Sequence, residues 1–201
     1  VETTVVENNF TNEFENYEKV FDDKSINILF LARLEEAKGV FVVLESFKKL
    51  IKQHPNFILN IAGTGKETNT VKKWLELNNN LPIHFNGRVE GINKIDLFKK
   101  AHFYVLPTTH PEGLPISILE AISSGCIVFV TPSGGLKDFF KHKEMGFLLN
   151  TASQTELTNQ IHIALKNKDL LKEISSNNIE KGQNLYTPFS LINRIKSNIY
   201  E

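Results

Sequence analysis

Short runs of apolar residues recur along the chain, and between them lie longer segments whose apolar residues return at helical spacing. A short continuous apolar run is typical of a strand buried on both faces of a parallel sheet. The predicted strands cover residues 26–32, 57–62, 83–85, 103–106, 127–131 and 147–149. The predicted helices cover residues 41–53, 69–77, 93–100, a segment opening at Pro115, a short segment after 133–135, and the chain from 155 onward, broken near Gly182 and Pro188.

Strands that alternate with helices through short loops indicate parallel βαβ units. The predicted fold is therefore α/β: a Rossmann-like, doubly wound parallel sheet of six strands flanked by helices. Ligands of such sheets bind at the carboxyl ends of the strands. We therefore expect the functional residues in the loops that follow the strands.

The loop after strand 103–106 is the most informative of these. Pro111 and Gly113 disfavour regular structure there, so Glu112 is predicted in a loop at the mouth of a helix. Pro115 suits the first turn of that helix. Glu120 is then expected about two turns inside it.

The start of this helix is also a predicted anion site. Its free N–H groups are expected at Leu114, Ile116 and Ser117. An anion site with Glu112 on one side and Glu120 on the other suits a ligand that carries both phosphate and hydroxyl groups. A nucleotide sugar is such a ligand.

Two cations, Arg33 and Lys38, flank the loop after the first strand. A pyrophosphate carries at least two negative charges, whereas a helix terminus offers only about half a charge. Full cations are needed to complete the neutralisation, and charge-assisted hydrogen bonds add roughly 1.5–3 kcal/mol each. Phosphate binding is favoured over a solvated surface loop because the glutamate loop is expected at the same edge.

Glycines follow several other strands. Gly63-Thr64-Gly65 resembles half of a dinucleotide-binding fingerprint, but Thr68 replaces its third glycine. Gly63 is therefore read as a tight turn that lets a ligand come close. Arg88 and its neighbours are expected to present backbone groups to a base. Gly134 and Gly135 form either a backbone site for phosphate or sugar or a plain turn into a helix.

Composition narrows the function classes. The 201 residues are 41% hydrophobic, enough for a sizeable core, and the zero net charge argues against a broad nucleic-acid interface. The single cysteine, Cys126, excludes an internal disulfide framework and fits a reducing compartment. None of the six histidines pairs at metal-ligand spacing, so no metal is expected. The incomplete glycine fingerprint argues against a bound dinucleotide, and no cofactor is expected. No apolar run approaches about 20 residues, so no transmembrane helix is predicted.

Taken in order, these motifs resemble the retaining glycosyltransferases of family four. The Glu112 and Glu120 pair, separated by seven residues, looks like the signature of that family. The resemblance covers about residues 26–150, and it departs at Ala32, where the family usually has Gly, and at Leu114-Pro115, where it often has Phe-Gly. Pro115 removes one amide donor. The motifs that carry the resemblance are Leu29–Leu34 with Lys38-Gly39, Ile61–Gly65, Phe85–Gly87, Val105–Pro107, Glu120–Gly125 and Gly134-Gly135.

The resemblance implies half of a GT-B fold, the carboxyl-terminal donor-binding half, in a transferase that keeps the anomeric configuration and uses no bound metal. It implies that Arg33 and Lys38 hold the diphosphate, that Glu112 contacts the donor sugar, and that Glu120 binds the ribose hydroxyls. The amides near Gly113, Leu114 and Ile116 would assist with the phosphates. Gly63, Arg88, Gly134 and Gly135 complete the expected substrate-binding set.

The expected organisation is a linker over residues 1–24, a nucleotide-sugar-binding domain over 25–186 and a closing helix over 187–201. The chain lacks an initiator Met and a signal-peptide pattern, so we expect a piece of a longer protein whose acceptor-binding half would receive a saccharide or lipid-linked acceptor. The piece alone is expected to be inactive. A cytoplasmic site is expected, with peripheral association at the inner face of the membrane left open. The alternatives are a nucleotide-sugar-binding module without transfer and a nucleotide-sugar epimerase of similar fold.

Overall fold

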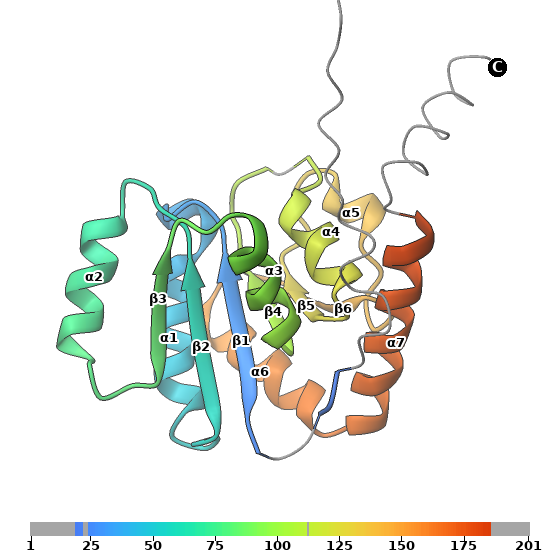
Figure 1. Cartoon of the computed structure of the whole chain (residues 1–201), viewed down its shortest axis with the longest axis horizontal. Coiled ribbons are helices and arrows are strands. Elements are labelled where there is room, and N and C mark those ends of the chain that lie inside the picture. The colour runs from blue at the N-terminus through green and yellow to red at the C-terminus, as the bar shows by residue number, and fades with distance from the viewer. Residues whose placement is uncertain (1–18, 22–23, 112, 186–201) are drawn as a thin grey trace, which may run out of the picture.

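Six parallel strands form one sheet, as the apolar runs predict (Figure 1). In the computed structural model, which describes residues 19–21, 24–111 and 113–185, the strand order is β3-β2-β1-β4-β5-β6. The strands are β1 (Ile26–Leu31), β2 (Phe57–Ala62), β3 (Ile83–Gly87), β4 (Phe103–Leu106), β5 (Ile127–Val130) and β6 (Gly146–Leu148). Every neighbouring pair is parallel, so the predicted Rossmann-like, doubly wound sheet is confirmed.

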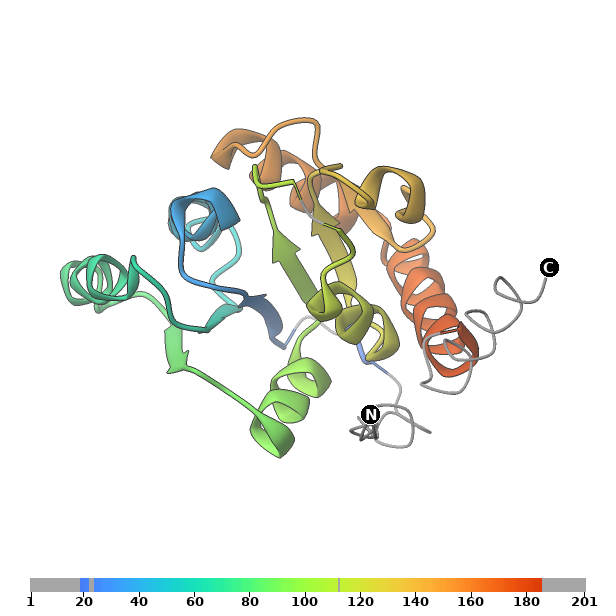
Figure 2. The ribbon, with the colours of Figure 1, turned by 90° about the horizontal axis from the view of Figure 1, so that it is seen from above.

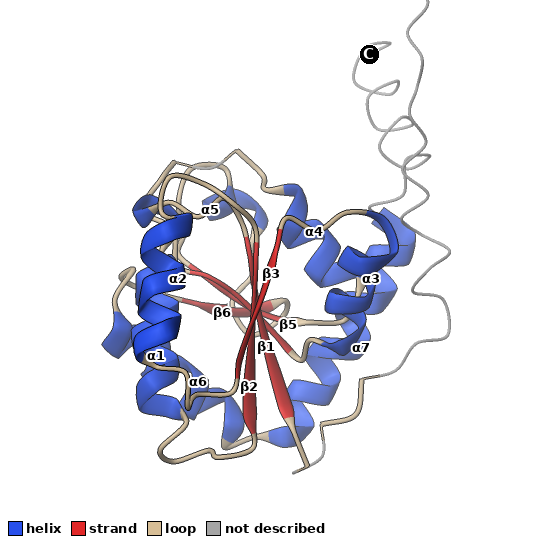
Figure 3. Ribbon diagram, turned by 60° about the vertical axis from the view of Figure 1, so that its left-hand side comes forward, coloured by secondary structure: helices blue, strands red, loops and turns tan. Residues whose placement is uncertain are grey.

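Helices cover both faces of the sheet (Figure 3). One face carries α1 (Val40–Leu50), α2 (Thr68–Leu77) and α6 (Gln154–Leu165), and the other carries α3 (Gly91–Lys100), α4 (Ile116–Ser123) and α7 (Lys168–Leu185). The short η1 (Glu36–Lys38) and α5 (Leu136–Phe139) lie in loops after β1 and β5. All residues of β4 and β5 are buried, because these strands lie inside the sheet with helices on both faces. Among the described residues, no helix has the length and hydropathy needed to cross a membrane.

The helical break predicted near Gly182 is wrong. Helix α7 runs through this position to Leu185, and the chain instead breaks between α6 and α7 at residues 166–167. A Cβ at Gly182 would lie 2.3 Å from the Cα of Ser123, so this glycine lets α7 approach α4 closely. The glycine therefore serves helix packing rather than helix termination. The break near Pro188 and the closing helix over 187–201 lie outside the described residues.

The described part of the predicted linker packs against the domain. Lys19 is buried, and its Nζ donates to the carbonyl oxygens of Phe98 (2.8 Å) and Lys99 (3.1 Å) at the end of α3. A cation suits the carbonyl end of a helix. Phe21 is also buried and contacts the ring of His102 edge-on. These residues therefore anchor the N-terminal segment on α3 and the sheet, and the rest of 1–24, apart from Val20 and Lys24, lies outside the described residues.

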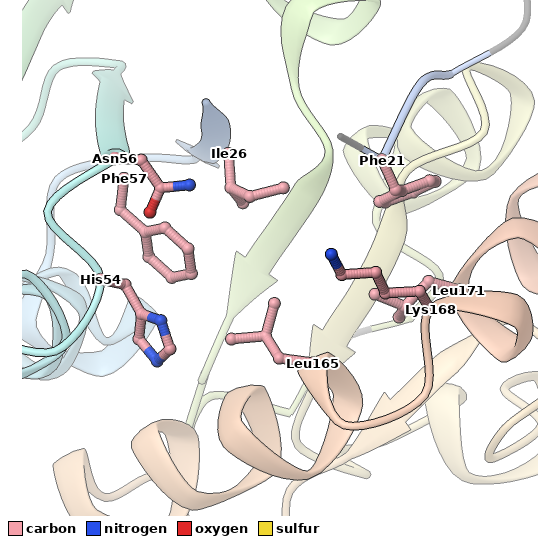
Figure 4. Close-up of a pocket in the computed structure, with 8 residues that line it drawn as sticks. All are labelled: Phe21, Ile26, His54, Asn56, Phe57, Leu165, Lys168 and Leu171. Carbon is pink, nitrogen blue, oxygen red and sulfur yellow. The ribbon is translucent and has the colours of Figure 1, made fainter. Parts of the chain in front are cut away.

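A cavity of about 200 Å³ lies near the amino end of β1, lined in part by His54, Phe57 and Leu165 (Figure 4). The His54 ring stacks on Phe57, with ring centroids 4.8 Å apart, and lies 5.3 Å from the ring of His162 on α6. The Nε2 atoms of both histidines are buried without a hydrogen-bond partner among the described residues. Burial, and next the neighbouring His162, lower the pKa of His54.

This lowered pKa makes stability depend on pH. Because the fold favours neutral His54, its contribution is complete above the unfolded-state pKa of about 6.5 and is lost as pH falls through the lower folded-state pKa. We expect the free energy of unfolding to fall as the pH drops below about 6.5. His54→Phe, which keeps a ring on Phe57 but cannot titrate, should make this fall shallower in urea melts. Equal slopes for the two proteins would contradict the assignment.

Candidate functional site

The carboxyl ends of the strands form one edge of the sheet, the upper edge in Figure 1 and the edge seen from above in Figure 2. The strand order reverses between β1 and β4. Loops on either side of such a reversal leave a crevice, which is where doubly wound sheets bind ligands. The loops after β1, β2, β3 and β4 are therefore the ones to inspect.

Hydrogen bonds tie the loop after β1 to two of its neighbours. The Leu34 N–H donates to the Thr64 carbonyl (3.1 Å), and the Thr109 N–H donates to the Ala37 carbonyl (2.8 Å). Gly39 closes η1 with a φ of +80°, and a Cβ there would lie 2.3 Å from the Pro107 carbonyl oxygen. The segment that carries Arg33 and Lys38 is thus held between the loops after β2 and β4.

A hollow of about 330 Å³ opens at this edge and brings together three predicted site residues, Arg33, Gly63 and Arg88. Ser117, near the start of α4, completes its far wall. The Tyr104 hydroxyl lies 2.8 Å from Ser117 Oγ and 3.0 Å from the Leu31 carbonyl oxygen, and so connects α4 to the end of β1. The residues that line the hollow are Leu31, Ala32, Arg33, Gly63, Thr64, Arg88, Val89 and Ser117.

Both arginines of the hollow have a nearby glutamate. Arg33 Nη1 lies 2.9 Å from Glu35 Oε1, and Arg88 donates from Nε (2.9 Å) and Nη2 (2.5 Å) to Glu90 Oε1. Their side chains are 65% and 76% exposed. Exposed ion pairs contribute only about 0–1 kcal/mol. An anion entering the hollow can therefore recruit either guanidinium at little cost.

Lys38 occupies a different environment. It ends η1, is only 7% exposed, and does not line the hollow. Its loop runs along Thr108 and Thr109, just before the loop of Glu112. Glu112 itself lies outside the described residues, so its predicted role stays a prediction.

The loops after β4 and β5 are joined to each other. The Ser133 hydroxyl donates to the His110 carbonyl (2.6 Å), and a Cβ at Gly135 would lie 2.7 Å from the Gly113 carbonyl oxygen. Gly113, Gly134 and Gly135 therefore gather in one place. The exposed Leu114 and Ile116 lie at the start of α4. The structure brings these five predicted residues to the same edge but not into the wall of the hollow.

Helix α4 begins one residue later than predicted. Pro115 is its N-cap rather than part of its first turn, with its carbonyl accepting from the Ile118 N–H at 3.0 Å. Glu120 is consequently the fifth residue of α4, one turn inside rather than two. Pro115 has a φ of −61° and a ψ of 125°, so its backbone is extended and the helical conformation begins only at Ile116.

Glu120 is 4% exposed, and its Oε1 accepts a hydrogen bond from Lys94 Nζ at 2.6 Å. Burial raises the pKa of Glu120, while the hydrogen bond and the charge of Lys94 oppose that rise. Lys94 was not among the predicted site residues, whereas Val89 belongs to the segment 87–89 that was expected to present backbone groups to a base. Lys94 looks like an ordinary exposed lysine of an amphipathic helix, and nothing in its spacing pairs it with Glu120. In the described ranges, no group of three or more side chains could hold a metal ion.

Known proteins resemble this chain in sequence and in fold. The family described as "Glycosyl transferases group 1" matches residues 11–181. An N,N'-diacetylbacillosaminyl-diphospho-undecaprenol alpha-1,3-N-acetylgalactosaminyltransferase of Campylobacter jejuni is 28% identical over 155 residues, which is 77% of this chain and 39% of the relative. The chain spans less than half the length of this relative.

Two solved structures share the fold. Anabaena Alr3699/HepE, in complex with UDP and glucose, superimposes with a TM-score of 0.75 at 20% identity, covering 89% of this chain and 49% of that one. The C-terminal domain of a glycosyl transferase group 1 family protein (LpcC) from Francisella tularensis gives a TM-score of 0.70 at 19% identity, covering 90% of this chain and 94% of that one.

Proposed function

The chain belongs to the glycosyl transferases group 1, and on that premise we propose that it is the donor-binding half of a retaining glycosyltransferase. This half would hold a nucleoside diphosphate sugar while a second half, absent from these 201 residues, presents the acceptor. The shares of two related proteins that this chain matches support the assignment to one half. The chain matches almost all of an isolated C-terminal domain of this family but less than half of a full-length relative.

The observation that carries the proposal is the convergence of Arg33, Gly63 and Arg88 on one hollow beside the start of α4. Two guanidinium groups, a glycine at Gly63 that leaves room for a close approach and a helix N-terminus together suit a ligand with a diphosphate. A structural neighbour with this fold holds UDP and glucose, which supports the same class of ligand.

Transfer breaks the bond between the anomeric carbon of the sugar and an oxygen of the diphosphate. Negative charge grows on the departing diphosphate as this bond breaks. Arg33 and Lys38 would stabilise that growing charge more strongly than the charge of the bound donor, which lowers the barrier. Glu112 would contact the sugar hydroxyls and Glu120 the ribose hydroxyls.

The acceptor is proposed to be a saccharide or a lipid-linked sugar of cell-surface polysaccharide or glycolipid synthesis. The diphospho-undecaprenol named for the Campylobacter jejuni relative supports this class of acceptor. Such an acceptor would bring the full-length protein to the inner face of a membrane.

A thermal-shift panel of nucleoside diphosphate sugars tests donor binding directly. A ligand at 100 times its Kd stabilises by about 2.7 kcal/mol, which shifts the Tm of a chain of this size by roughly 5–11 °C. We expect one nucleotide to stand out, and we expect these residues alone to bind donor without transferring its sugar. A flat panel would contradict the proposal. Transfer by the full-length protein to an added acceptor separates a transferase from a module that only binds.

Glu120→Gln is expected to weaken nucleoside diphosphate binding by about 1.5–3 kcal/mol, the value of a hydrogen bond to a charged group. Glutamine keeps the size of the side chain but removes the charge that would attract the ribose hydroxyls. Titration calorimetry measures the change. The matched control is Glu76→Gln on α2, an exposed glutamate remote from the hollow, which should bind normally. Unchanged affinity in Glu120→Gln would remove Glu120 from the site.

A further inference from the structure

An ion pair joins helices α3 and α4 beside the proposed donor site. Lys94, in the first turn of α3, donates from Nζ to Glu120 Oε1 at 2.6 Å. The side chain of Glu120 is 5% exposed and that of Lys94 is 24% exposed. A charge held this far from water needs a close partner, because an unpaired carboxylate in such a place strongly favours its neutral form.

Among the described residues, one oxygen of the Glu120 carboxylate has a hydrogen-bond partner. Across residues 19–21, 24–111 and 113–185, Lys94 is the only hydrogen-bond partner found for it, and Oε1 is the atom used. Glu120 lies three positions after Ser117, so both residues are on the same face of α4. Because Ser117 lines the hollow, Glu120 lies about one helical turn from a residue of its wall.

We propose that Lys94 is a positioning residue, which holds the Glu120 carboxylate charged and oriented so that its second oxygen accepts a hydrogen bond from a ribose hydroxyl. This inference rests on the proposed function. A carboxylate free to rotate, or one that carries a proton, would be a poorer acceptor for that hydroxyl. Lys94 thereby acts on the ribose through Glu120 and not by touching the nucleotide.

The competing explanation is that the ion pair merely fastens α3 to α4. The two explanations differ in which ligands they affect. If the ion pair only fastens the two helices, losing Lys94 would lower stability and would weaken the binding of every nucleotide to the same degree. A positioning role would remove the advantage of ligands that have ribose hydroxyls over ligands that lack them.

The experiment therefore measures a ratio of affinities. UDP, GDP and ADP are titrated first, and the tightest of the three is compared with its 2′,3′-dideoxy form. We expect the natural chain to prefer the ribonucleotide by roughly tenfold or more, as for a hydrogen bond to a charged acceptor. Lys94→Met should bring this ratio close to one, whereas Lys94→Arg should keep most of it.

Two further variants isolate the route through Glu120. In the Glu120→Gln background, adding Lys94→Met should change the ratio no further, because the charge on which Lys94 acts is already gone. Lys100→Met, an exposed lysine of the same helix, should leave the ratio as in the natural chain. If Lys94→Met does not fold, Lys94→Gln keeps a donor without the charge and should still lower the ratio.

An unchanged ratio in the folded Lys94 variants, or an equal loss of both nucleotides, would overturn the positioning role and leave a structural tie. If the natural chain binds nucleoside diphosphates but ignores the ribose hydroxyls, donor binding stands and this inference fails. If it binds none of the three nucleotides, the proposed function fails and this inference falls with it.

Discussion

Lys38→Ala is expected to weaken nucleoside diphosphate binding by about 2–3 kcal/mol, or roughly 30–150-fold. Lys38 is the one buried cation of the loop after β1, and burial strengthens its interaction with a phosphate because less water screens the charge. Arg33→Ala should cost less, since Arg33 is 65% exposed and water screens its charge. Calorimetric titration at low and high salt measures both changes.

The free nucleoside provides the internal control for this prediction. It lacks the phosphates, so Lys38→Ala should leave its affinity unchanged. Lys49→Ala, on the exposed end of α1, should not change the affinity for either ligand. An equal loss of nucleoside and diphosphate, or a normal affinity for both, would show that Lys38 does not hold the diphosphate.

Gly63→Ala is expected to lower the free energy of unfolding by at least about 3 kcal/mol, through strain and overpacking together. Gly63 has a φ of +129°, and a Cβ there would lie 1.9 Å from the carbonyl oxygen of Ala32. Its N–H also donates to the Gly87 carbonyl at 2.6 Å, so it cannot move away without loosening the end of β3. For a chain of this size, the loss corresponds to a Tm lower by roughly 6–12 °C.

Two other glycines separate the causes of this loss. Gly87 also has a positive φ, +61°, but no heavy atom lies within 4 Å of its added Cβ, so Gly87→Ala should show backbone strain alone, about 1–2 kcal/mol. Gly113 has open space and no positive φ, so Gly113→Ala should be nearly neutral. If Gly63→Ala lowers the free energy of unfolding no more than Gly87→Ala does, the close approach of the loops after β1 and β2 does not require a glycine at position 63.

The fold was predictable because buried parallel strands are apolar throughout. The predicted β2 and β4 match at both ends. Strands β1 and β5 end one residue earlier than predicted, and β6 begins and ends one residue earlier. Strand β3 was predicted two residues short, since it lies at the sheet edge and alternates half-buried with exposed residues. The break between α6 and α7 was missed because no glycine or proline marks it. Gly182 led to the prediction of a break that does not exist, because this glycine lies inside α7 and lets it approach α4 closely.

The site was only partly predictable, because the topology places loops but does not say which side chains pair. Parallel topology alone places Arg33, Gly63 and Arg88 at one edge, and the structure brings them to one hollow. Side-chain pairing does not follow from topology. Lys94 and Glu120 are 26 positions apart on different helices, and only three-dimensional packing brings the lysine onto the carboxylate.

The glutamates beside Arg33 and Arg88 have a consequence for selectivity among polyanions. Each arginine carries its own counter-charge two residues away, so these two arginines add little net charge to the mouth of the hollow. A long-range electric field that would draw in nucleic acid or stray inorganic phosphate is correspondingly weak. We expect capture to depend on short-range fit, with each guanidinium released from its glutamate only by a ligand whose phosphates reach it.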